Sequence, residues 1–450
     1  MEVAVSSDYS QTPSEELDNR RVMEESPADF ASVEHIVSHA SVAEAWKKVR
    51  ANKGSPGVDG ISIEAFPEWC KPRWKLYKEQ LLMGSYQPSP ALRVEIPKES
   101  GGVRFLGIPC VMDRVLMQAI AKVFGNIFDP TFSDYSYGYR PKRSVQHAAR
   151  QAQAYYQQGY VFQVDIDLEK FFDTVNHDVL MSLVSKRVKN KGLLKLLGRF
   201  LRAGVVVDGR LQPTRKGVPQ GSPVSPILSN ILLDVLDKEL EFRGHKFVRY
   251  ADDLAIFVKS ERAGERVLAS VSQFLERKLK VKVNKGKSKV SHVRDSSVLG
   301  FNIHHKKLRT LECKVHAFKR KLKHITRRCP GISIESRIIR LKHYVQGRMA
   351  HYGCGLKYHD AVEFDGWIRR RLRMCYWKQW RRPRKRIREL IKLGVKVREA
   401  IYLGLSRKSY WRLSKTLVTN TGLNNKHFEK IGLISVRTLW CKIHHPATAR

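Results

Sequence analysis

Two short runs of β-favouring residues, 247–250 and 254–258, stand so close together that the chain between them can only reverse direction. Ala251, Asp252 and Asp253 are the only residues between them, so the pattern predicts a hairpin whose turn carries two adjacent carboxylates. Adjacent like charges repel, and a divalent cation such as Mg²⁺ would relieve the repulsion because it prefers carboxylate and phosphate oxygens. An ordinary polar turn is the alternative explanation of this pair.

A second acidic segment supports the metal hypothesis. Residues 161–168 alternate like a strand, and Asp165 and Asp167 lie on one face while apolar residues lie on the other. Such a strand can meet the hairpin turn and complete a site for two metal ions, an arrangement that activates a 3′ hydroxyl and stabilises a leaving pyrophosphate. The alternative is that both aspartates are solvated strand residues.

The overall charge indicates what the chain binds. It has 450 residues with 83 Lys and Arg against 43 Asp and Glu, a formal net charge of +40, and 42% of its residues are apolar, so it can bury a core. No stretch approaches the roughly 18 consecutive apolar residues of a membrane span, and seven irregularly spaced cysteines do not make a disulfide scaffold. A polyanionic partner is therefore expected, and nucleic acid is the commonest one.

The charge divides the chain into three parts. Residues 1–40 carry two basic and nine acidic residues, a net charge of −7, and match neither a secretory signal nor an organelle presequence, so we expect a mobile acidic leader. Residues 41–310 sum to +20. Residues 311–450 carry 35 basic and 8 acidic residues, a net charge of +27, and form a very basic C-terminal third.

Helices and strands mix without a strict βαβ rhythm, which favours an α+β fold. The expected strands and helices outside the acidic segments span 93–97, 103–108, 41–50, 113–128 and 227–240. The two strands flank the glycine turn Gly101-Gly102. Ser225 is a possible N-cap of the last helix, with Pro226 at its first position.

The acidic segments resemble two motifs of reverse transcriptases. Residues 250–253, Tyr-Ala-Asp-Asp, are similar to the YxDD box, and residues 167–173 resemble motif A, in which the metal-binding aspartate precedes an aromatic residue by five positions. Counting back from Phe172 selects Asp167, rather than Asp165, as the ligand. The order and separation of the two motifs also match a polymerase palm.

Five further segments resemble blocks of group II intron reverse transcriptases. In chain order they are 96–109 followed by Asp113 and Arg114, then 136–141, 216–223, the set Asn284, Lys287 and Ser288, and 299–301. The resemblance is closest to bacterial group II intron-encoded proteins, which combine reverse transcriptase and maturase activities. Among these, the chain resembles the compact kind that lacks an endonuclease domain.

The resemblance implies a right-hand polymerase, with fingers and a palm that contain antiparallel sheet, then a helical thumb or maturase domain X, and a small basic DNA-binding domain. The implied segments are a leader at 1–40, an N-terminal extension at 41–90, the reverse transcriptase fingers and palm at 91–310, the thumb at 311–385 and the DNA-binding domain at 386–450.

The resemblance also implies the catalytic residues. Asp167, Asp252 and Asp253 would be catalytic and would bind two Mg²⁺ ions, and the backbone of Leu168 is not assigned as a ligand. No zinc is expected, because the seven cysteines include no C-x-x-C pair.

A second set of residues is implied for the incoming nucleotide. Cations on a fingers hairpin would close on its triphosphate, and a bulky ring at the sugar would exclude a 2′ hydroxyl and favour dNTPs. The implied nucleotide-binding residues are Lys98, Arg104, Phe172, Gln220 and Lys287. Solvated surface charge is the alternative for the cations, and core packing beside Phe171 is the alternative for the ring.

The basic C-terminal third contains a helical run at 367–380, with apolar residues at every fourth position and cations between them. Charge favours phosphate binding, and aromatic rings can stack on bases. The candidate nucleic-acid-binding residues are Arg369, Arg370, Arg373, Lys378, Arg381 and Arg382. A solvated amphipathic helix is the alternative.

The implied function is RNA-directed DNA polymerisation by a group II intron-encoded protein that copies intron RNA and aids splicing and retrohoming. Its implied partners are intron RNA, an RNA template with a DNA or RNA primer, target DNA and dNTPs, without a membrane, in the bacterial cytoplasm or nucleoid. One alternative is a domesticated relative in DNA repair or phage defence, which would carry the same motifs. Another is a non-catalytic splicing cofactor, against which the intact aspartates argue.

Overall fold

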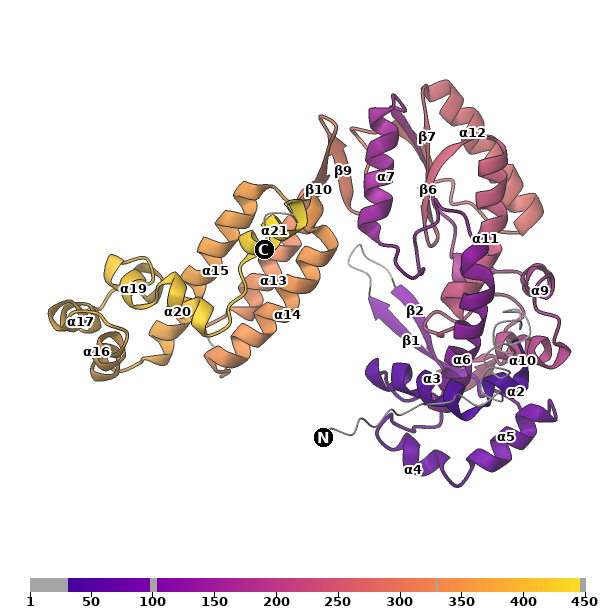
Figure 1. Ribbon diagram of the computed structural model, residues 1–450, viewed down its shortest axis with the longest axis horizontal. Coiled ribbons are helices and arrows are strands. Elements are labelled where there is room, and N and C mark those ends of the chain that lie inside the picture. The colour runs from indigo at the N-terminus through magenta and orange to yellow at the C-terminus, as the bar shows by residue number, and fades with distance from the viewer. Residues whose placement is uncertain (1–30, 98–102, 329–330, 446–450) are drawn as a thin grey trace, which may run out of the picture. The chain divides into compact units, whose positions relative to one another are not determined.

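The computed structural model describes residues 31–97, 103–328 and 331–445, and it divides the chain into two compact units (Figure 1). The first unit takes the residues up to Ser144 together with Val164–Val290. The second takes Val145–Gln163 together with the residues from Ser291 onward. Both units mix helix and sheet, so the predicted α+β class is confirmed.

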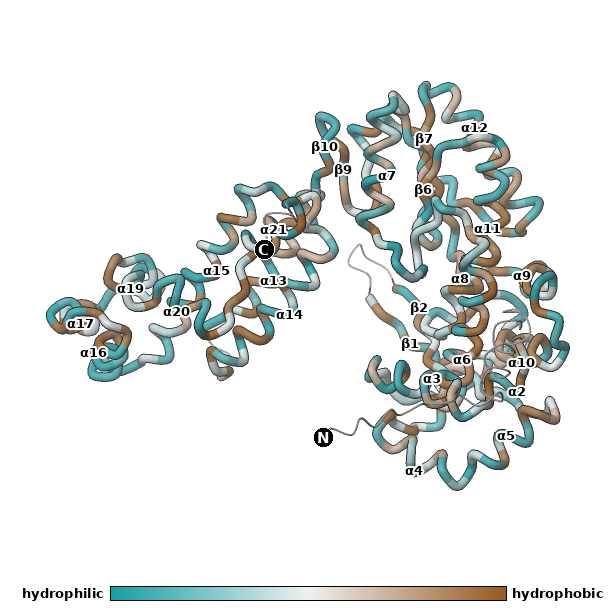
Figure 2. Tube along the Cα trace, in the orientation of Figure 1, coloured by the Kyte–Doolittle hydropathy of each residue, from teal (hydrophilic) through white to brown (hydrophobic). Residues whose placement is uncertain are grey.

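The first unit opens with helices that pack around one apolar helix. The helices are α2 (Val33–Ile36), α3 (His39–Ala51), α4 (Phe66–Cys70), α5 (Trp74–Leu82) and α6 (Val111–Phe128). Most of α6 is buried and it packs against α3, so the helices predicted at 41–50 and 113–128 are confirmed. Figure 2 shows the hydrophobic residues along α6.

The predicted leader ends earlier than residue 40. Ser32 accepts a hydrogen bond from His35 N and begins α2, and Val33 and Ile36 are buried. Residues 33–40 therefore belong to the folded unit, because most of their apolar side chains are buried in its core. The acidic composition of residues 1–40 as a whole gave no indication of this burial. Ala31 and Ser32 are described as well, and Ala31 is buried, so only residues 1–30 of the predicted leader lie outside the described residues.

The fingers sheet has the strand order β2-β1-β4-β5. Its strands are β1 (Ala91–Pro97), β2 (Val103–Ile108), β4 (Val205–Val207) and β5 (Arg210–Gln212). β1 and β2 pair antiparallel from Leu92 opposite Ile108 to Pro97 opposite Val103, so the predicted hairpin strands are confirmed. Lys98 and the glycines of its turn lie outside the described residues.

The other four-stranded sheet carries the hairpin and the strand of the acidic segments. It has the order β6-β7-β3-β8, from β6 (Lys246–Tyr250), β7 (Asp253–Val258), β3 (Phe162–Ile166) and β8 (Lys289–His292). β6 and β7 are antiparallel with Tyr250 opposite Asp253, so Ala251 and Asp252 alone form the turn. The predicted hairpin is confirmed, and Asp253 is the first residue of β7. Because β3 is the neighbour of β7, the two acidic segments belong to adjacent strands.

Helix α11 (Ser225–Phe242) packs against β6, as the helix predicted at 227–240. The predicted cap is wrong, because Ser225 is already helical and the N-cap residue Val224 makes no side-chain capping bond. The Ser225 hydroxyl instead donates to the Pro219 carbonyl at 2.8 Å. This contact connects the start of the helix to the preceding loop. A local sequence pattern does not predict it.

The helices that complete the first unit are α8 (Phe171–Thr174), α9 (His177–Ser185), α10 (Lys191–Arg202) and α12 (Glu261–Phe274). The second unit contains α7 (Val145–Gln157), the hairpin of β9 (Phe301–His304) and β10 (Lys307–Thr310), and then α13 (Glu312–Ile325), α14 (Ile334–Tyr352) and α15 (Tyr358–Gln379). It ends with α16 (Pro383–Lys392), α17 (Val397–Gly404), α18 (Tyr410–Leu413), α19 (Leu417–Gly422), α20 (Asn425–Lys430) and α21 (Val436–His444).

One hydrophobic core runs through the helices of the second unit, from Phe318 on α13 to Val436 on α21. Trp377 of α15 is fully buried in it and donates from Nε1 to Thr419 Oγ1 at 3.3 Å. Asp365 of α15 accepts hydrogen bonds from Ser435 Oγ and Val436 N at the start of α21. The core therefore continues across residue 385, where the sequence places a domain boundary. In the described part of the chain, no helix is both long and apolar enough to cross a membrane.

A buried carboxyl at the start of α6 makes the stability of the first unit depend on pH. Asp113 is 1% exposed and accepts hydrogen bonds from Tyr86 Oη at 2.7 Å and Ser89 N at 3.1 Å. Burial outweighs these bonds and raises the pKa of Asp113 to about 7. In an unfolded chain the pKa is about 3.9, so the folded state binds this proton more tightly. The resulting stabilisation is fully present below about pH 4 and is lost as the pH rises through about 7.

We predict that Asp113→Asn removes this part of the pH dependence, whatever it does to stability at one pH. Between about pH 5 and about pH 8, the free energy of unfolding should fall less in the variant, by on the order of 1–3 kcal/mol. Urea denaturation at a series of pH values measures the difference. Glu68→Gln, at an exposed position of α4, is the matched control. An Asp113→Asn profile parallel to that of the parent would contradict the assignment.

Candidate active site

Three aspartates from neighbouring strands form an electrostatically coupled group in the first unit. Asp252 lies in the β6–β7 turn, Asp253 begins β7, and Asp167 follows the last residue of β3. Ala251, which precedes the pair, has φ of 59°, so the tight turn forces an alanine into a left-handed conformation. Such strain persists where the surroundings hold the turn in place.

The coupling shows in the proton affinities of the carboxyls. Partial burial raises the pKa of Asp253 to about 6, with further contributions from the charges of Asp252, Asp167 and Asp165, even though part of the side chain reaches solvent. Burial also raises the pKa of Asp252; the Arg104 charge lowers it and the Asp167 charge raises it. Negative charge is therefore concentrated in this group against the sign of the whole protein.

Asp167 is held by the turn that precedes β8. Asn284 donates from Nδ2 to Asp167 Oδ2 at 3.0 Å and from its backbone N to the Asp167 carbonyl at 2.8 Å. Ser288 Oγ accepts a bond from Asp167 N at 3.1 Å, and Lys287 Nζ lies 3.9 Å from Asp167 Oδ2. The sequence block that contains these three residues thus has one local role: it orients Asp167.

A buried arginine holds the turn that carries the other two aspartates. Arg249 precedes the turn on β6, and its side chain is 1% exposed. Its guanidinium donates to the Asp237 carboxylate, which is 0% exposed, through Nε at 2.7 Å and Nη2 at 2.5 Å. The remaining bonds run to Asn230 Oδ1 and the Ala251 carbonyl at 2.9 Å each and to Ser136 Oγ at 2.8 Å. The acidic turn is therefore bonded to α11 and to the loop before α7.

The same loop touches the turn directly at a glycine. Asn230 Nδ2 donates to the Gly138 carbonyl at 2.9 Å. A Cβ added at Gly138 would lie 2.2 Å from Ala251 N, closer than any side chain tolerates. The Ser-Tyr-Gly-Tyr-Arg-Pro block at 136–141 thus needs glycine because backbone packs against backbone there.

Arg104 and Gln220, two of the predicted nucleotide-binding residues, are in contact. Arg104 Nε on β2 donates to Gln220 Oε1 at 2.8 Å, and Gly107 N donates to the Gln220 carbonyl at 2.7 Å. The 216–223 loop is bonded to α8 as well, because Val218 N donates to the Phe172 carbonyl at 2.7 Å. One loop therefore joins the fingers hairpin to the segment that follows Asp167.

Phe172 is 7% exposed and meets Phe171 edge to face, with ring centroids 5.3 Å apart. Lys287, the last member of the predicted set, is 70% exposed. The roles of these residues toward a nucleotide remain predictions.

The donor set fits a divalent cation that shares its ligands with a substrate. Carboxylate oxygens are the donors that Mg²⁺ prefers, and it is commonly bound by one or two carboxylates together with substrate phosphates and water. Within the described residues, no group of three or more His, Cys, Asp or Glu side chains is close enough to hold a metal ion by itself. An open set of carboxylates, in which the pKa values of Asp252 and Asp253 are raised, is compatible with a site that a substrate completes.

The predicted nucleic-acid-binding cations on and after α15 fall into two groups. Arg370 lies over the Trp411 ring at 3.9 Å, and Arg373 donates from Nε to the Leu423 carbonyl at 2.9 Å. Burial lowers the pKa of Arg373 to about 10. Arg369 is half-buried, whereas the other three, Lys378, Arg381 and Arg382, are exposed. The first group is partly buried and has internal contacts, whereas the second is exposed, although Lys378 Nζ also lies 5.9 Å from the centre of the Tyr410 ring.

Comparisons with known proteins identify the chain's relatives. Residues 96–303 match the family model for a reverse transcriptase (RNA-dependent DNA polymerase), and residues 315–394 match the group II intron, maturase-specific domain. Protein YkfC of Escherichia coli strain K12 is 32% identical over 315 residues, which cover 61% of this chain and 83% of that protein.

This chain belongs to the group II intron reverse transcriptase and maturase family. The family and the enzyme class predicted from the motifs are confirmed, and the acidic group lies inside the reverse transcriptase domain. Reverse transcriptase domains generally use divalent metal ions, which agrees with the donor set.

Two further relatives of this reverse transcriptase are intron-encoded. The putative COX1/OXI3 intron 2 protein of Saccharomyces cerevisiae is 31% identical over 318 residues, covering 57% of this chain and 36% of that protein. The group II intron-encoded protein LtrA of Lactococcus lactis is 32% identical over 195 residues, covering 43% of this chain and 32% of that protein. The chain spans about a third of the length of these two.

Sequence reasoning missed the residues that support the reverse transcriptase's acidic turn. A signal was present, because Asn230 and Asp237 are seven positions apart on α11 and so lie on one face of an otherwise apolar helix. Arg249 is likewise a buried charge in β6, directly after the buried apolar residues Phe247 and Val248. Polar residues that interrupt a core-facing pattern need partners, and here they are one another's.

We predict that Arg249→Met strongly destabilises the enzyme, because it leaves the Asp237 carboxylate buried without its partner. The free energy of unfolding should fall by about 3–5 kcal/mol. The double variant Arg249→Met/Asp237→Leu should recover most of that loss but not primer extension, since the Ala251 carbonyl still lacks its donor. Arg243→Met, which breaks the partly exposed ion pair between Arg243 at the end of α11 and Glu239, is the control and should cost about 0–1 kcal/mol.

Urea denaturation and primer extension on the four proteins make the measurement. Full extension by the double variant would show that the turn keeps its geometry without Arg249, and the positioning role would then be wrong.

Proposed function

We propose that this protein copies intron RNA into DNA by nucleotidyl transfer and binds the intron RNA to assist splicing and retrohoming. The observation that carries the proposal is the electrostatic coupling of Asp167 with Asp252 and Asp253 inside the reverse transcriptase domain of a chain that also has a maturase-specific domain. The maturase domain favours an intron-linked role over a role in repair or defence. The coupled carboxylates favour a catalyst over a splicing cofactor without catalysis.

Asp167, Asp252 and Asp253 would hold two Mg²⁺ ions, which would activate the primer 3′ hydroxyl and stabilise the leaving pyrophosphate. The protein's own residues prepare this arrangement. Asn284 and Ser288 fix the orientation of Asp167, and Arg249 fixes the turn that carries the other two. Because these bonds exist before a substrate binds, the carboxylates need little rearrangement at the moment of reaction.

The incoming dNTP would meet the fingers hairpin. Arg104 already reaches Gln220, so its guanidinium is placed between the hairpin and the loop near the acidic turn. A triphosphate would replace the Gln220 amide oxygen as the stronger, charged acceptor. Lys98 would add a second cation from the hairpin turn, and Lys287 would meet the phosphates at the primer terminus.

The proposed partners are intron RNA, an RNA template with a DNA or RNA primer, target DNA and dNTPs. Exposed Lys378, Arg381 and Arg382 are available for phosphates, as is much of a C-terminal third with a net charge of +27. The proposed location is the bacterial cytoplasm or nucleoid, where such partners occur.

We predict that Asp252→Ala abolishes primer extension on an RNA template and leaves intron RNA binding largely intact, because the carboxylate acts on the metal and not on the RNA. The assay uses Mg²⁺, dNTPs and a labelled primer, with a parallel filter-binding measurement. Asp178→Ala, an exposed aspartate in the first turn of α9, is the control and should extend normally. Full extension by the Asp252→Ala variant would sink the active-site assignment.

A second prediction concerns Phe172. If its ring excludes a 2′ hydroxyl, Phe172→Ala should raise ribonucleotide incorporation relative to dNTP incorporation by at least an order of magnitude, about 1.4 kcal/mol of discrimination. Competition between NTP and dNTP in single-nucleotide extension measures the ratio. Phe171→Leu tests whether loosening the neighbouring core alone has the same effect. An unchanged ratio in Phe172→Ala would leave that residue with a packing role only.

A further inference from the structure

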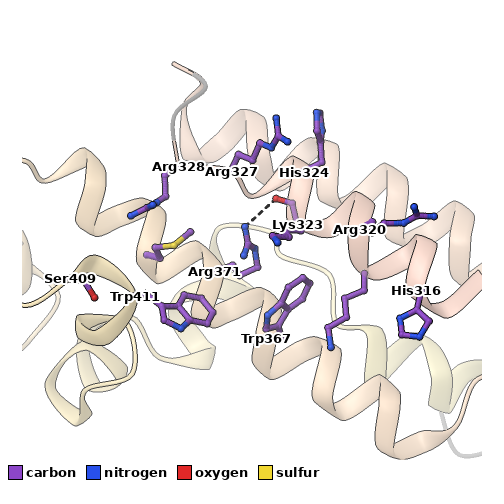
Figure 3. Close-up of a pocket in the computed structure, with 12 residues that line it drawn as sticks. His316, Arg320, Lys323, His324, Arg327, Arg328, Trp367, Arg371, Ser409 and Trp411 are labelled. Atoms are coloured by element: carbon purple, nitrogen blue, oxygen red, sulfur yellow. Dashed lines mark hydrogen bonds between the residues drawn. The ribbon is translucent and has the colours of Figure 1, made fainter. Parts of the chain in front are cut away.

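The second unit contains a basic and aromatic pocket that the proposed polymerase chemistry does not use. Helices α13, α15 and α18 line it, and it has a volume of about 1320 Å³ (Figure 3). Six Lys and Arg residues, two histidines and two tryptophans contribute side chains to the lining. None of the described residues that line the pocket carries a carboxylate. Drug-sized ligands occupy pockets of roughly 300–1,000 Å³, so this one has room for a larger anionic segment.

The cations on the α13 side are exposed and available. Lys323, Arg327 and Arg328 line the pocket without a carboxylate partner in the described part of the chain. Lys319 has Glu363 at 3.6 Å, but both side chains are about half exposed, so this pair is weak and can open. Cations gathered around a concavity in this way attract a polyanion.

The two tryptophans are positioned by arginines. Arg371 lies over the Trp367 ring at 5.1 Å and donates to Thr326 Oγ1 at 2.5 Å and to the Lys323 carbonyl at 3.1 Å, the bond drawn in Figure 3. Arg370 lies over the Trp411 ring at 3.9 Å. Both indoles are half-buried and line the same pocket. Each indole is therefore held by an arginine before anything binds, and Lys319 Nζ also lies over the Trp367 ring at 5.7 Å.

This combination selects among anions. A simple phosphate or an acidic peptide would pair with the cations, but it would not stack on the indole rings. A nucleotide uses both, because its phosphates pair with Lys and Arg while its base stacks on an aromatic ring. Double-stranded DNA keeps its bases stacked on one another, whereas RNA offers unpaired bases in loops, bulges and ends.

We propose that the pocket binds an unpaired segment of RNA, with a base stacked on Trp411 or Trp367 and the adjoining phosphates on Lys323, Arg327 and Arg328. The inference rests on the proposed function, which makes RNA a partner of this protein. It adds the site at which an unpaired segment of that RNA binds. Arg370 and Arg371 then act through the indoles that they hold, as positioning residues.

The test uses the full chain and a labelled unpaired RNA of about ten nucleotides, within the site sizes known for single-strand binders. DNA of the same sequence and a blunt RNA duplex are the comparison probes. Trp411→Leu should weaken binding of the unpaired RNA about 5- to 100-fold and binding of the duplex hardly at all. Trp411→Phe should restore most of the affinity, which separates stacking from a folding defect. Tyr402→Leu, at a 77% exposed aromatic residue of α17, is the matched control.

The charge half of the proposal has its own readout. Arg327→Gln/Arg328→Gln should reduce the slope of log affinity against log salt by about 1.4, since each phosphate contact on a single strand contributes about 0.7. Trp411→Leu should leave this slope unchanged. Lys426→Gln/Lys430→Gln, two exposed lysines of α20, control for general loss of charge.

Three results would overturn the proposal: unchanged affinity in Trp411→Leu, an unchanged slope in Arg327→Gln/Arg328→Gln, or DNA binding as tight and as dependent on Trp411 as RNA binding. Primer extension by the parent protein in the same preparation tests the proposed function separately. Asp252→Ala should lose extension and keep its Trp411-dependent RNA binding. The failure of either proposal can therefore be told from the failure of the other.

Discussion

The buried ion pair between Arg249 and Asp237 is the interaction on which the acidic site depends. An isolated charge inside a protein is costly, and a buried pair is tolerated only when its remaining hydrogen-bonding groups are also satisfied. Here the guanidinium is satisfied by Asp237, Asn230, Ser136 and the Ala251 carbonyl. A helix, a loop, a strand and the acidic turn are thereby joined through one side chain. The turn can hold a strained backbone and repelling carboxylates because this network leaves it few alternatives.

Negative charge is concentrated at the candidate active site, and positive charge is concentrated in the C-terminal third of the chain. The protein as a whole carries +40, yet in its reverse transcriptase domain burial, together with the charge of Asp167, raises the pKa values of Asp252 and Asp253. Folding alone does not reward that arrangement. In the second unit the arginines have a double use. Arg370 and Arg371 lie over Trp411 and Trp367, which pack against the hydrophobic core, while cations beside them are exposed.

Much of the fold could be predicted because its signals are local. The period of two in residues 161–168 and the short gap before residue 254 depend only on neighbouring positions, and the hairpin formed as expected. The strand predicted at 161–168 also formed, but it ends at Ile166, so Asp167 directly follows it. The N-cap of α11 was misplaced because the Ser225 hydroxyl bonds to the Pro219 carbonyl, a contact that helix periodicity does not encode. The end of the leader was misplaced because Val33 and Ile36 are buried in a unit where α2 packs against α5 and α6, far along the chain, as well as against the neighbouring α3.

The sequence by itself determined the family and the α+β class, since these follow from residue types at fixed spacing. The same spacing predicts Asp167, rather than Asp165, as the metal ligand. The tertiary structure decided which residues hold the candidate site residues in place. Asn284 reaches Asp167 across 117 positions, and Arg104 reaches Gln220 across 116. Such partners share no local period with the residues they hold. Only a folded chain, in which burial forces every polar group to find a partner, brings them together.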